Sequence, residues 1–311
     1  MIDALSKAMF GALAGSGALK AMASRYGMRG RRGFARRFVA GETIDEAIAA
    51  ARAVEAQGLV QTLDLLGESV ATVEAAGAAT NAYLAMLPRI AAAGIGRNIS
   101  IKLTQLGLDL SLDDAGGNLR RILTLAREQG FFVRVDMESS AYVDATLTLV
   151  EQVWREGHTN VGVVLQSALK RSEADLDRVL ALGARVRLVK GAYKEPASVA
   201  YQSKAEVDAA YVRLLERLLP HGQFPAIATH DPLMIAHARR IAAAAGLAAS
   251  AFEYQMLYGV RRDLQASLAR EGFGVRVYIP YGREWFPYFM RRLGERPANV
   301  AFVLKSLVRE G

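Results

Sequence analysis

The chain has 311 residues, of which 52% are hydrophobic and 23% charged, and its mean hydropathy is +0.13. This composition predicts a large buried core rather than disorder, and no apolar run is long enough to span a bilayer. The sequence has no cysteine. Disulfides, thiolate nucleophiles, iron–sulfur clusters and cysteine-bound zinc are therefore excluded, and a cytoplasmic location is expected.

Positive charge is concentrated in the N-terminal segment. The net charge is +8, and a single acid, Asp3, precedes Glu42, against eight basic residues: Lys7, Lys20, Arg25, Arg29, Arg31, Arg32, Arg36 and Arg37. We expect a helical arm over residues 1–57, with a helix at Ile44–Ala56, that serves solvation or packs against the body of the protein. Peripheral contact with an anionic membrane surface is the second interpretation, and the composition also resembles a transit peptide. Nucleic acid binding is not expected, because no basic helix carries interleaved aromatic residues.

Beyond residue 58, short apolar runs alternate with amphipathic segments. Strands are predicted at Leu59–Leu66, Asn98–Leu103, Phe131–Asp136, Asn160–Gln166, Arg185–Lys190, Pro225–Thr229, Ser250–Tyr254 and Val275–Ile279. Helices are predicted between them at Val73–Ala93, Leu119–Glu128, Ala141–Glu156, Glu173–Leu182, Lys204–Leu219, Pro232–Ala245 and Tyr258–Glu271. Eight such units favour an α/β fold, a single (βα)8 barrel over residues 58–311, and a doubly wound open sheet is the alternative.

Polar residues follow every predicted strand, where a barrel of this kind places its active site. In chain order they are Asp64, Glu68, Lys102, Thr104, Asp136, Glu138, Gln166, Lys190, Thr229, His230, Asp231, Glu253, Gln255 and Tyr278. A polar residue after one strand is ordinary, but one after each of eight strands indicates a functional face. For His230 alone, a structural role in a satisfied hydrogen bond is the alternative.

A last helix is predicted after Gly282 and ends at Pro297, over the mouth of the barrel. Its helical spacing places Tyr288, Arg291 and Arg292 on one side. Two adjacent guanidinium groups suit a small carboxylate, because each planar fork can bind both oxygens. In the alternative, the helix is solvated and Glu295 pairs with the two arginines.

The cations Lys102, Arg187, Lys190, Arg291 and Arg292 are expected to converge with few acids nearby, which calls for an anionic ligand. Lys102 and Lys190 could instead form Schiff bases, so a barrel lyase or aldolase remains an alternative, as does a binding module without activity. Neither a metal-binding motif nor a Rossmann or P-loop glycine motif occurs in the sequence.

Several strings, in order from about Leu59 to Val303, resemble monofunctional proline dehydrogenases of the bacterial type. They are Thr62-Leu63-Asp64-Leu65-Leu66-Gly67-Glu68, Ser100-Ile101-Lys102-Leu103, Val135-Asp136-Met137-Glu138, Arg187-Leu188-Val189-Lys190-Gly191-Ala192-Tyr193, Ala228-Thr229-His230-Asp231, Phe252-Glu253-Tyr254-Gln255-Met256-Leu257, Val277-Tyr278-Ile279-Pro280-Tyr281-Gly282 and Tyr288-Phe289-Met290-Arg291-Arg292-Leu293. The resemblance implies a barrel that carries FAD, oxidises L-proline to Δ1-pyrroline-5-carboxylate by hydride transfer to flavin N5, and passes the electrons to a membrane quinone.

The same resemblance implies roles for individual residues. Asp136 and Arg187 correspond to catalytic positions. Substrate contacts are implied for Lys102, Tyr278, Tyr288, Arg291, Arg292, Leu257 and Glu68, with the last of these pairing with Arg291 as a gate. Flavin contacts are implied for Met137, Gln166, Arg187, Val189, Lys190, Gly191, Ala192, Thr229, His230 and Glu295. In a cationic pocket Asp136 is expected to orient its neighbours rather than act as a base, and nothing in the sequence identifies the group that deprotonates the substrate amine.

Overall fold

The computed structural model describes residue 28 and residues 33–295, and these form a closed barrel of eight parallel strands. The strands are β1 (Val60–Leu65), β2 (Asn98–Ile101), β3 (Phe132–Val135), β4 (Val161–Gln166), β5 (Arg185–Val189), β6 (Ala226–Ala228), β7 (Glu253–Leu257) and β8 (Gly274–Tyr281). Each strand pairs with the next along the chain, and β8 closes the ring on β1. The predicted (βα)8 barrel is confirmed, and the open sheet is excluded.

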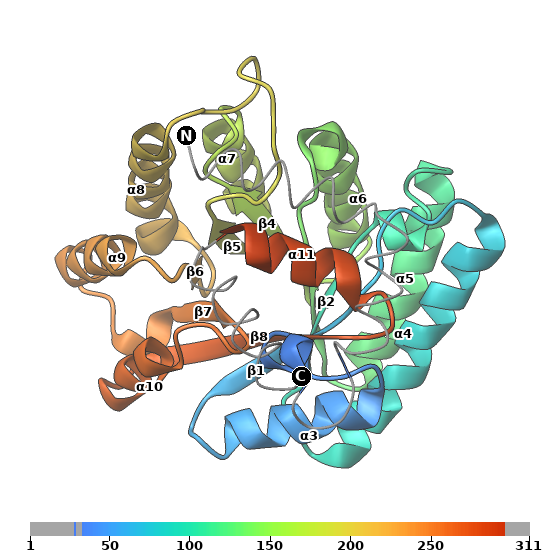
Figure 1. The fold of residues 1–311 in the computed structure, drawn as a ribbon. Helices are drawn as coiled ribbons and strands as arrows, with labels where there is room; N and C mark the ends of the chain where they lie inside the picture. Colours follow the sequence, from blue (N-terminus) through green and yellow to red (C-terminus); the bar gives the residue numbers. More distant parts are fainter. Residues whose placement is uncertain (1–27, 29–32, 296–311) are drawn as a thin grey trace.

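Helices surround the barrel on its outer side (Figure 1). They are α3 (Ile44–Glu55), α4 (Val73–Ala93), α5 (Leu112–Glu128), α6 (Val143–Arg155), α7 (Ser172–Leu182), α8 (Lys204–His221), α9 (Pro232–Ala244) and α10 (Arg262–Arg270), whereas α11 (Trp285–Glu295) lies across the end of the barrel. Short 3-10 turns are η1 (Phe34–Arg37), η2 (Thr104–Leu106), η3 (Ser140–Tyr142) and η4 (Ala249–Ala251). The main hydrophobic core lies between the strands and this ring, and its strand residues are almost completely buried.

Local sequence signals explain where several helices begin. Thr43 and Glu46 form a reciprocal capping box at the start of α3, and Ser203 and Glu206 form another at the start of α8. Each box satisfies backbone N–H groups that have no partner inside the helix. Helix α5 begins at Leu112, seven residues before its predicted start, because Ser111 caps it. The pair Gly116-Gly117 lowers helix propensity there, but tertiary packing overrides it.

Two helices, α3 and α11, differ from the others in position. Helix α3 packs against both β1 and β8, on the outer side of the seam where the barrel closes. Helix α11 follows β8 but lies across the end of the barrel instead of returning along its side (Figure 1). Helix α3 therefore covers the position that a helix after β8 would occupy, which leaves α11 free to face the mouth. The division into an arm over 1–57 and a barrel over 58–311 remains a prediction, and residues 1–27 and 29–32 lie outside the described part.

The seventh strand was predicted three residues too early. The sequence pattern predicts Ser250–Tyr254, but Ala249–Ala251 form η4 and the strand runs from Glu253 to Leu257. Glu253 therefore stands at the start of β7, at the end of the barrel away from the mouth. There its carboxylate accepts hydrogen bonds from Arg276 on β8, at 2.8 and 3.0 Å. The expectation that Glu253 and Gln255 end this strand is wrong, and Gln255 donates to Glu253.

The turn after β7 gives a test of backbone packing. Gly259 has φ +74°, and a Cβ atom there would lie 1.7 Å from the carbonyl oxygen of Arg37. Gly58 has the same φ, with no other atom within 4 Å of that position. Gly58→Ala should lower the free energy of unfolding by about 1 kcal/mol, from backbone strain alone. Gly259→Ala should cost about 1–3 kcal/mol more, because the turn must move away from Arg37. Urea unfolding measures both, and equal losses in the two variants would contradict this packing.

Candidate active site

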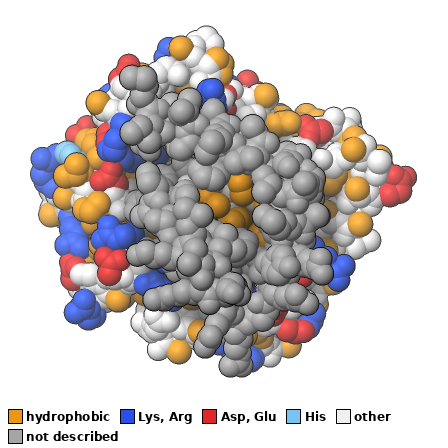
Figure 2. Space-filling view, in the orientation of Figure 1, with side chains coloured by type: hydrophobic (Ala, Val, Ile, Leu, Met, Phe, Trp, Pro, Cys, Tyr) orange, Lys and Arg blue, Asp and Glu red, His pale blue; other side chains and the backbone are white. Residues whose placement is uncertain are grey.

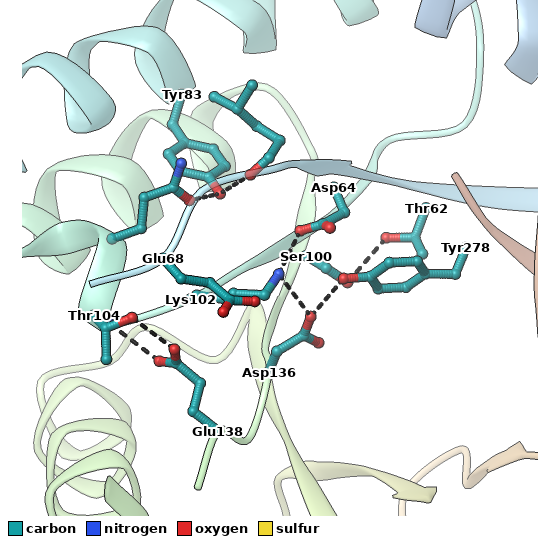
Figure 3. A network of polar contacts seen from close by, with 12 residues as sticks. Thr62, Asp64, Glu68, Tyr83, Ser100, Lys102, Thr104, Asp136, Glu138 and Tyr278 are labelled. Carbon is teal, nitrogen blue, oxygen red and sulfur yellow. Dashed lines mark hydrogen bonds and ion pairs between the residues drawn. The ribbon is translucent and has the colours of Figure 1, made fainter. Parts of the chain in front are cut away.

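A buried ion cluster lies inside the barrel near its mouth, where residues from neighbouring strands stand in register (Figure 3). The ammonium group of Lys102, just after β2, lies 3.0 Å from Asp64 Oδ1 on β1 and 3.7 Å from Asp136 Oδ2 after β3. Asp64 is fully buried and Lys102 is 7% exposed. Three successive strands thus bring one cation between two carboxylates.

Asp136 also joins this cluster to β5 and β8. Its Oδ1 accepts a hydrogen bond from Arg187 Nη1 at 2.7 Å, and its Oδ2 accepts one from the Tyr278 hydroxyl at 2.7 Å. Arg187 Nη2 donates to Ser100 Oγ at 3.0 Å, and its guanidinium lies 5.3 Å from the centre of the Tyr278 ring. Asp136 therefore fixes the predicted catalytic Arg187 and the predicted substrate contact Tyr278, as expected of an orienting group.

Charge compensation sets the ionisation of this cluster. Burial alone would lower the pKa of Lys102, but the charges of Asp64 and Asp136 outweigh burial and raise that pKa above its usual value. Burial, followed by the charge of Asp136, raises the pKa of Tyr278 well above its usual value. At neutral pH Lys102 therefore carries its charge and Tyr278 its proton.

A second buried network supports the loops after β1, β3 and β4. Both carboxylate oxygens of Glu138 accept hydrogen bonds from Thr104, one from its backbone N–H and one from its hydroxyl. Gln166 Nε2 donates to the Glu138 carbonyl at 2.7 Å, and the Thr104 hydroxyl accepts from the Ser69 N–H. Gln166 is therefore fixed at the end of β4, and its role as a cofactor contact stays a prediction.

Helix α11 brings its arginines to the mouth. Arg291 donates from Nη1 and Nη2 to the two oxygens of Glu68, at 3.0 and 2.5 Å, which is a bidentate pair. Arg292 is buried, and its guanidinium lies 5.1 Å from the centre of the Tyr288 ring. The predicted pairing of Glu68 with Arg291 is present in this structure. The alternative, in which Glu295 pairs with the two arginines, concerns a side chain outside the described residues.

Tyr193 follows β5, and the sequence analysis predicts no role for it, but charges of the site act on its hydroxyl. Burial raises the pKa of Tyr193, and the charges that act on it next are those of Glu68, Arg291, Glu138 and Lys102. Glu68 also acts electrostatically on Lys102. The sequence signal was available, because Tyr193 follows the small residues Gly191 and Ala192.

Lys190 belongs to a separate charge cluster at the rim. Its ammonium lies 2.5 Å from Asp208 on α8 and 2.8 Å from Asp231, the N-cap of α9, and Lys204 pairs with the same two carboxylates. The expectation that few acids accompany the cations is wrong for Lys102, Arg187, Lys190 and Arg291, since each of them has a carboxylate partner. Among the described residues, no group of histidines and acids is arranged to hold a metal ion.

The other predicted cofactor residues lie at the ends of β3 to β6. Met137, Gln166 and Thr229 are buried, and Val189 and His230 are half-buried. Gly191 has φ +113°, and a Cβ there would lie 2.9 Å from Gln166 Oε1, so only glycine leaves room at this point. His230 Nε2 accepts a hydrogen bond from the Leu257 N–H at 3.0 Å, which links β6 to the predicted substrate contact on β7. The roles of these residues as cofactor contacts remain predictions.

Comparison with known proteins shows the family of this chain. The family model described as proline dehydrogenase matches residues 47–305. The chain belongs to the proline dehydrogenase family. Proline dehydrogenase of Deinococcus radiodurans is 45% identical over 279 residues, covering 88% of this chain and 90% of the relative. Proline dehydrogenase 2 of Bacillus subtilis is 39% identical over 298 residues, covering 96% and 97%. The predicted enzyme class is confirmed by these matches.

Solved structures of the family share the barrel. The crystal structure of proline utilization A (PutA) from Bdellovibrio bacteriovorus, inactivated by N-propargylglycine, superimposes with a TM-score of 0.79 at 26% identity. The match covers 84% of this chain and 32% of that one. The match therefore spans about a third of the length of that PutA protein.

The ion pairs of Lys190 and Lys204 with Asp208 and Asp231 should make the free energy of unfolding depend on pH. Burial would raise the pKa of Asp231, but hydrogen bonds from Lys190 and the Leu233 N–H, with the charges of Lys190 and Lys204, lower it to about 2. A carboxyl group whose pKa is depressed on folding stabilises the protein above its unfolded pKa, and this stability is lost as pH falls towards the folded pKa. Asp231→Asn should therefore cost about 2 kcal/mol at pH 7, and the difference should vanish between about pH 4 and pH 2.

Urea unfolding of Asp231→Asn and of the unchanged protein at several pH values measures this effect. Asp263→Asn is the control, because Asp263 pairs with Arg261 on the surface and is 69% exposed. Its loss should be below about 1 kcal/mol. A loss for Asp231→Asn that is the same at pH 7 and pH 3 would show that charge is not the cause.

Proposed function

We propose that this protein oxidises L-proline to Δ1-pyrroline-5-carboxylate, using FAD as cofactor and a membrane quinone as electron acceptor. The observation that carries the proposal is the paired arginines of α11, which lie above a buried array of compensated charges in a member of the proline dehydrogenase family. The array presents cations at the mouth and hydrogen-bonding groups below it. A small zwitterion with one carboxylate fits this arrangement.

The carboxylate of Glu68 marks the place of the substrate carboxylate. Arg291 holds Glu68 through both guanidinium nitrogens, and the side chains of this pair are 31% and 28% exposed. A substrate carboxylate can replace Glu68 on Arg291, because it offers the guanidinium the same two oxygens and the pair is partly open to solvent. Arg292 and Lys102 then complete the set of cations around the substrate carboxylate.

The residues fit the proposed FAD. Arg187 Nε is buried, and no described residue accepts a hydrogen bond from it, although both terminal nitrogens of this guanidinium are bound. Arg187, Gln166, Gly191 and Ala192, with Met137, Val189, Lys190, Thr229, His230 and Glu295, are the residues proposed to hold the cofactor. When bound, a flavin accepts the hydride from the carbon next to the proline nitrogen.

The chain's own groups orient the substrate for that transfer. Arg291 and Arg292 fix its carboxylate, and Tyr278 and Tyr288 bound the ring, with Leu257 as an apolar neighbour. Asp136 holds Tyr278 and Arg187 in place through the hydrogen bonds described above. Fixing the substrate at its carboxylate places the reacting carbon without direct chemistry at that atom. Backbone N–H groups at Gly191 and Ala192 can approach a cofactor closely because their side chains are small.

The lyase alternative is disfavoured by the state of both lysines. A Schiff base requires a neutral amine, but Lys102 lies between two carboxylates that raise its pKa. Lys190 lies between Asp208 and Asp231 at the rim. The environment of Lys102 therefore disfavours the neutral amine, and Lys190 is occupied by two ion pairs.

A quinone acceptor would require the protein to reach a membrane surface. Among the described residues, no helix is long and apolar enough to cross a bilayer. Peripheral contact on the inner face of the cell membrane through the basic arm is therefore the proposed route, with the protein otherwise cytoplasmic. Liposome co-sedimentation of the full chain, compared with a chain lacking residues 1–41, tests the arm. Equal binding of the two chains would remove the arm from this role.

The activity itself is tested by one absorbance experiment. Protein purified with FAD should be yellow, and anaerobic addition of L-proline should bleach the flavin absorbance. A colourless protein, or a flavin spectrum that proline leaves unchanged, would contradict the proposal. Borohydride trapping of a carbonyl compound on Lys190 or Lys102 would support the lyase instead.

The carboxylate clamp makes a further prediction. Arg291→Ala and Arg292→Ala should each raise KM for proline by roughly 10- to 100-fold, because a charge-assisted contact is worth about 1.5–3 kcal/mol. Arg283→Ala is the matched control, since Arg283 precedes the same helix but is exposed, and its KM should not change. Steady-state kinetics measures all three variants. An unchanged KM in both Arg291→Ala and Arg292→Ala would exclude the clamp.

A further inference from the structure

Glu68 lies on a short segment whose backbone is fixed on both sides of it. Gly67 precedes it and packs against the buried side chain of Gln105, so closely that a Cβ atom on this glycine would lie 2.3 Å from Gln105 Nε2. Ser69 follows it and has φ +48°, in the left-handed region that residues other than glycine rarely adopt. A backbone conformation of this kind persists only where its surroundings hold it in place.

Thr104 provides the hydrogen bonds that hold Ser69. The Ser69 N–H donates to Thr104 Oγ1 at 3.0 Å, and the Val70 N–H donates to the Thr104 carbonyl oxygen at 3.3 Å. Thr104 is fully buried and is the first residue of η2, which follows β2. The segment that carries Glu68 is therefore attached to the turn after the neighbouring strand.

Glu138 fixes the direction of the Thr104 hydroxyl group. The single hydroxyl hydrogen is donated to Glu138 Oε1 at 2.6 Å, which leaves the lone pairs of Oγ1 to accept from the Ser69 N–H (Figure 3). The other oxygen of this carboxylate accepts from the Thr104 N–H at 3.2 Å. The contacts thus run from Glu138 through Thr104 to the residue next to Glu68.

The position of Glu68 matters because this residue competes with the substrate. Arg291 binds either Glu68 or the substrate carboxylate, so the apparent affinity for the substrate falls as the internal pair forms more often. A bidentate pair requires both side chains to be ordered, and this ordering costs less entropy when the backbone is already fixed. A rigid support for Glu68 therefore strengthens the competitor, and a loose support weakens it.

We propose that Thr104 is a positioning residue that, through the backbone of Ser69, holds Glu68 against Arg291 and so sets the affinity of the enzyme for the substrate carboxylate; this inference rests on the proposed function. Thr104 acts through Glu68 and not on the reacting atoms. Its hydroxyl group should therefore affect the binding of a carboxylate and leave kcat unchanged.

Calorimetric titration of the FAD-loaded protein tests the proposal. The ligand is the analogue of proline in which an ether oxygen replaces the ring nitrogen, so that binding is measured without oxidation. Thr104→Val keeps the shape of the side chain but removes the hydroxyl group, and its Kd should be about 3- to 10-fold lower, the effect of losing one neutral hydrogen bond. KM for proline should fall by the same factor, with kcat unchanged. Thr104→Ser retains the hydroxyl group and should bind the analogue as the unchanged protein does.

Two further variants separate positioning from a loss of stability. Thr72 lies in the same connection between β1 and α4, and its hydroxyl oxygen caps α4 by accepting from the Ala75 N–H at 3.2 Å. Thr72→Val should lower the midpoint of urea unfolding, because a helix cap is lost, but should leave Kd unchanged. In a Glu68→Ala background, Thr104→Val should make no further change in Kd, because the competitor is absent.

Hydrogen exchange on the unchanged protein tests the same coupling and does not depend on the folding of any variant. If the bond between Ser69 and Thr104 favours the Glu68–Arg291 pair, then the pair must favour that bond to the same extent. Addition of the analogue displaces Glu68 from Arg291, so the Ser69 amide should exchange faster. An exchange rate that stays the same or falls would overturn the proposal.

The titrations give two more outcomes that would overturn it. One is a Kd for Thr104→Val that equals or exceeds that of the unchanged protein. The other is an equal decrease in Kd with and without Glu68, since Thr104 would then act by a different route. Reduction of the flavin by proline and binding of the analogue by the unchanged protein test the proposed function separately. If both occur but Thr104→Val leaves Kd unchanged, this inference alone is wrong.

Discussion

The compensation of buried cations by carboxylates on neighbouring strands is the constraint on which this site depends. An ammonium or guanidinium group inside a barrel loses its hydration and is stable there only beside an acid that accepts its hydrogen bonds. Lys102 meets this condition through Asp64 and Asp136, and Arg187 meets it through Asp136 and Ser100. Because the strands are parallel and in register, residues far apart in sequence become adjacent at one end of the barrel.

This constraint also separates fixed from exchangeable interactions. The pairs within the barrel are almost fully buried, and breaking one would leave an uncompensated charge. The pair of Arg291 with Glu68 is partly exposed and connects α11 to the loop after β1. A substrate carboxylate can therefore exchange with Glu68 without disturbing the pairs below. The position of α11 across the mouth, made possible because α3 covers the seam between β1 and β8, places this exchangeable pair over the fixed ones. On the same face, hydrophobic side chains are visible near the centre, where Figure 1 places α11 (Figure 2).

Much of this arrangement could be predicted from the sequence, because it follows from local patterns. The alternation of strands and helices predicted the barrel, and the polar residues on β1 and β8 and just after β2 and β3 indicated the cluster around Lys102. Strand boundaries were less certain where the signal is weak, as in β7. There a 3-10 turn at Ala249–Ala251 displaces the strand and carries Glu253 to the opposite end of the barrel.

The sequence could not predict which charged side chains form ion pairs with one another. Asp208 lies on α8 and Asp231 caps α9, and their pairing with Lys190 depends on how those helices pack. The sequence could not indicate which charges act on Tyr193, because those that act on its hydroxyl include Glu68 and Arg291, both distant in the chain.

The most direct test of the account is a crystal structure of the FAD-bound protein with the oxygen-ring analogue of proline, in which an ether oxygen replaces the amine so that the ligand cannot be oxidised. The account predicts that the ligand carboxylate binds Arg291 and Arg292 in the place of Glu68, while Lys102 remains between Asp64 and Asp136. A ligand bound elsewhere, or one bound with the Arg291–Glu68 pair intact and no arginine on its carboxylate, would contradict it.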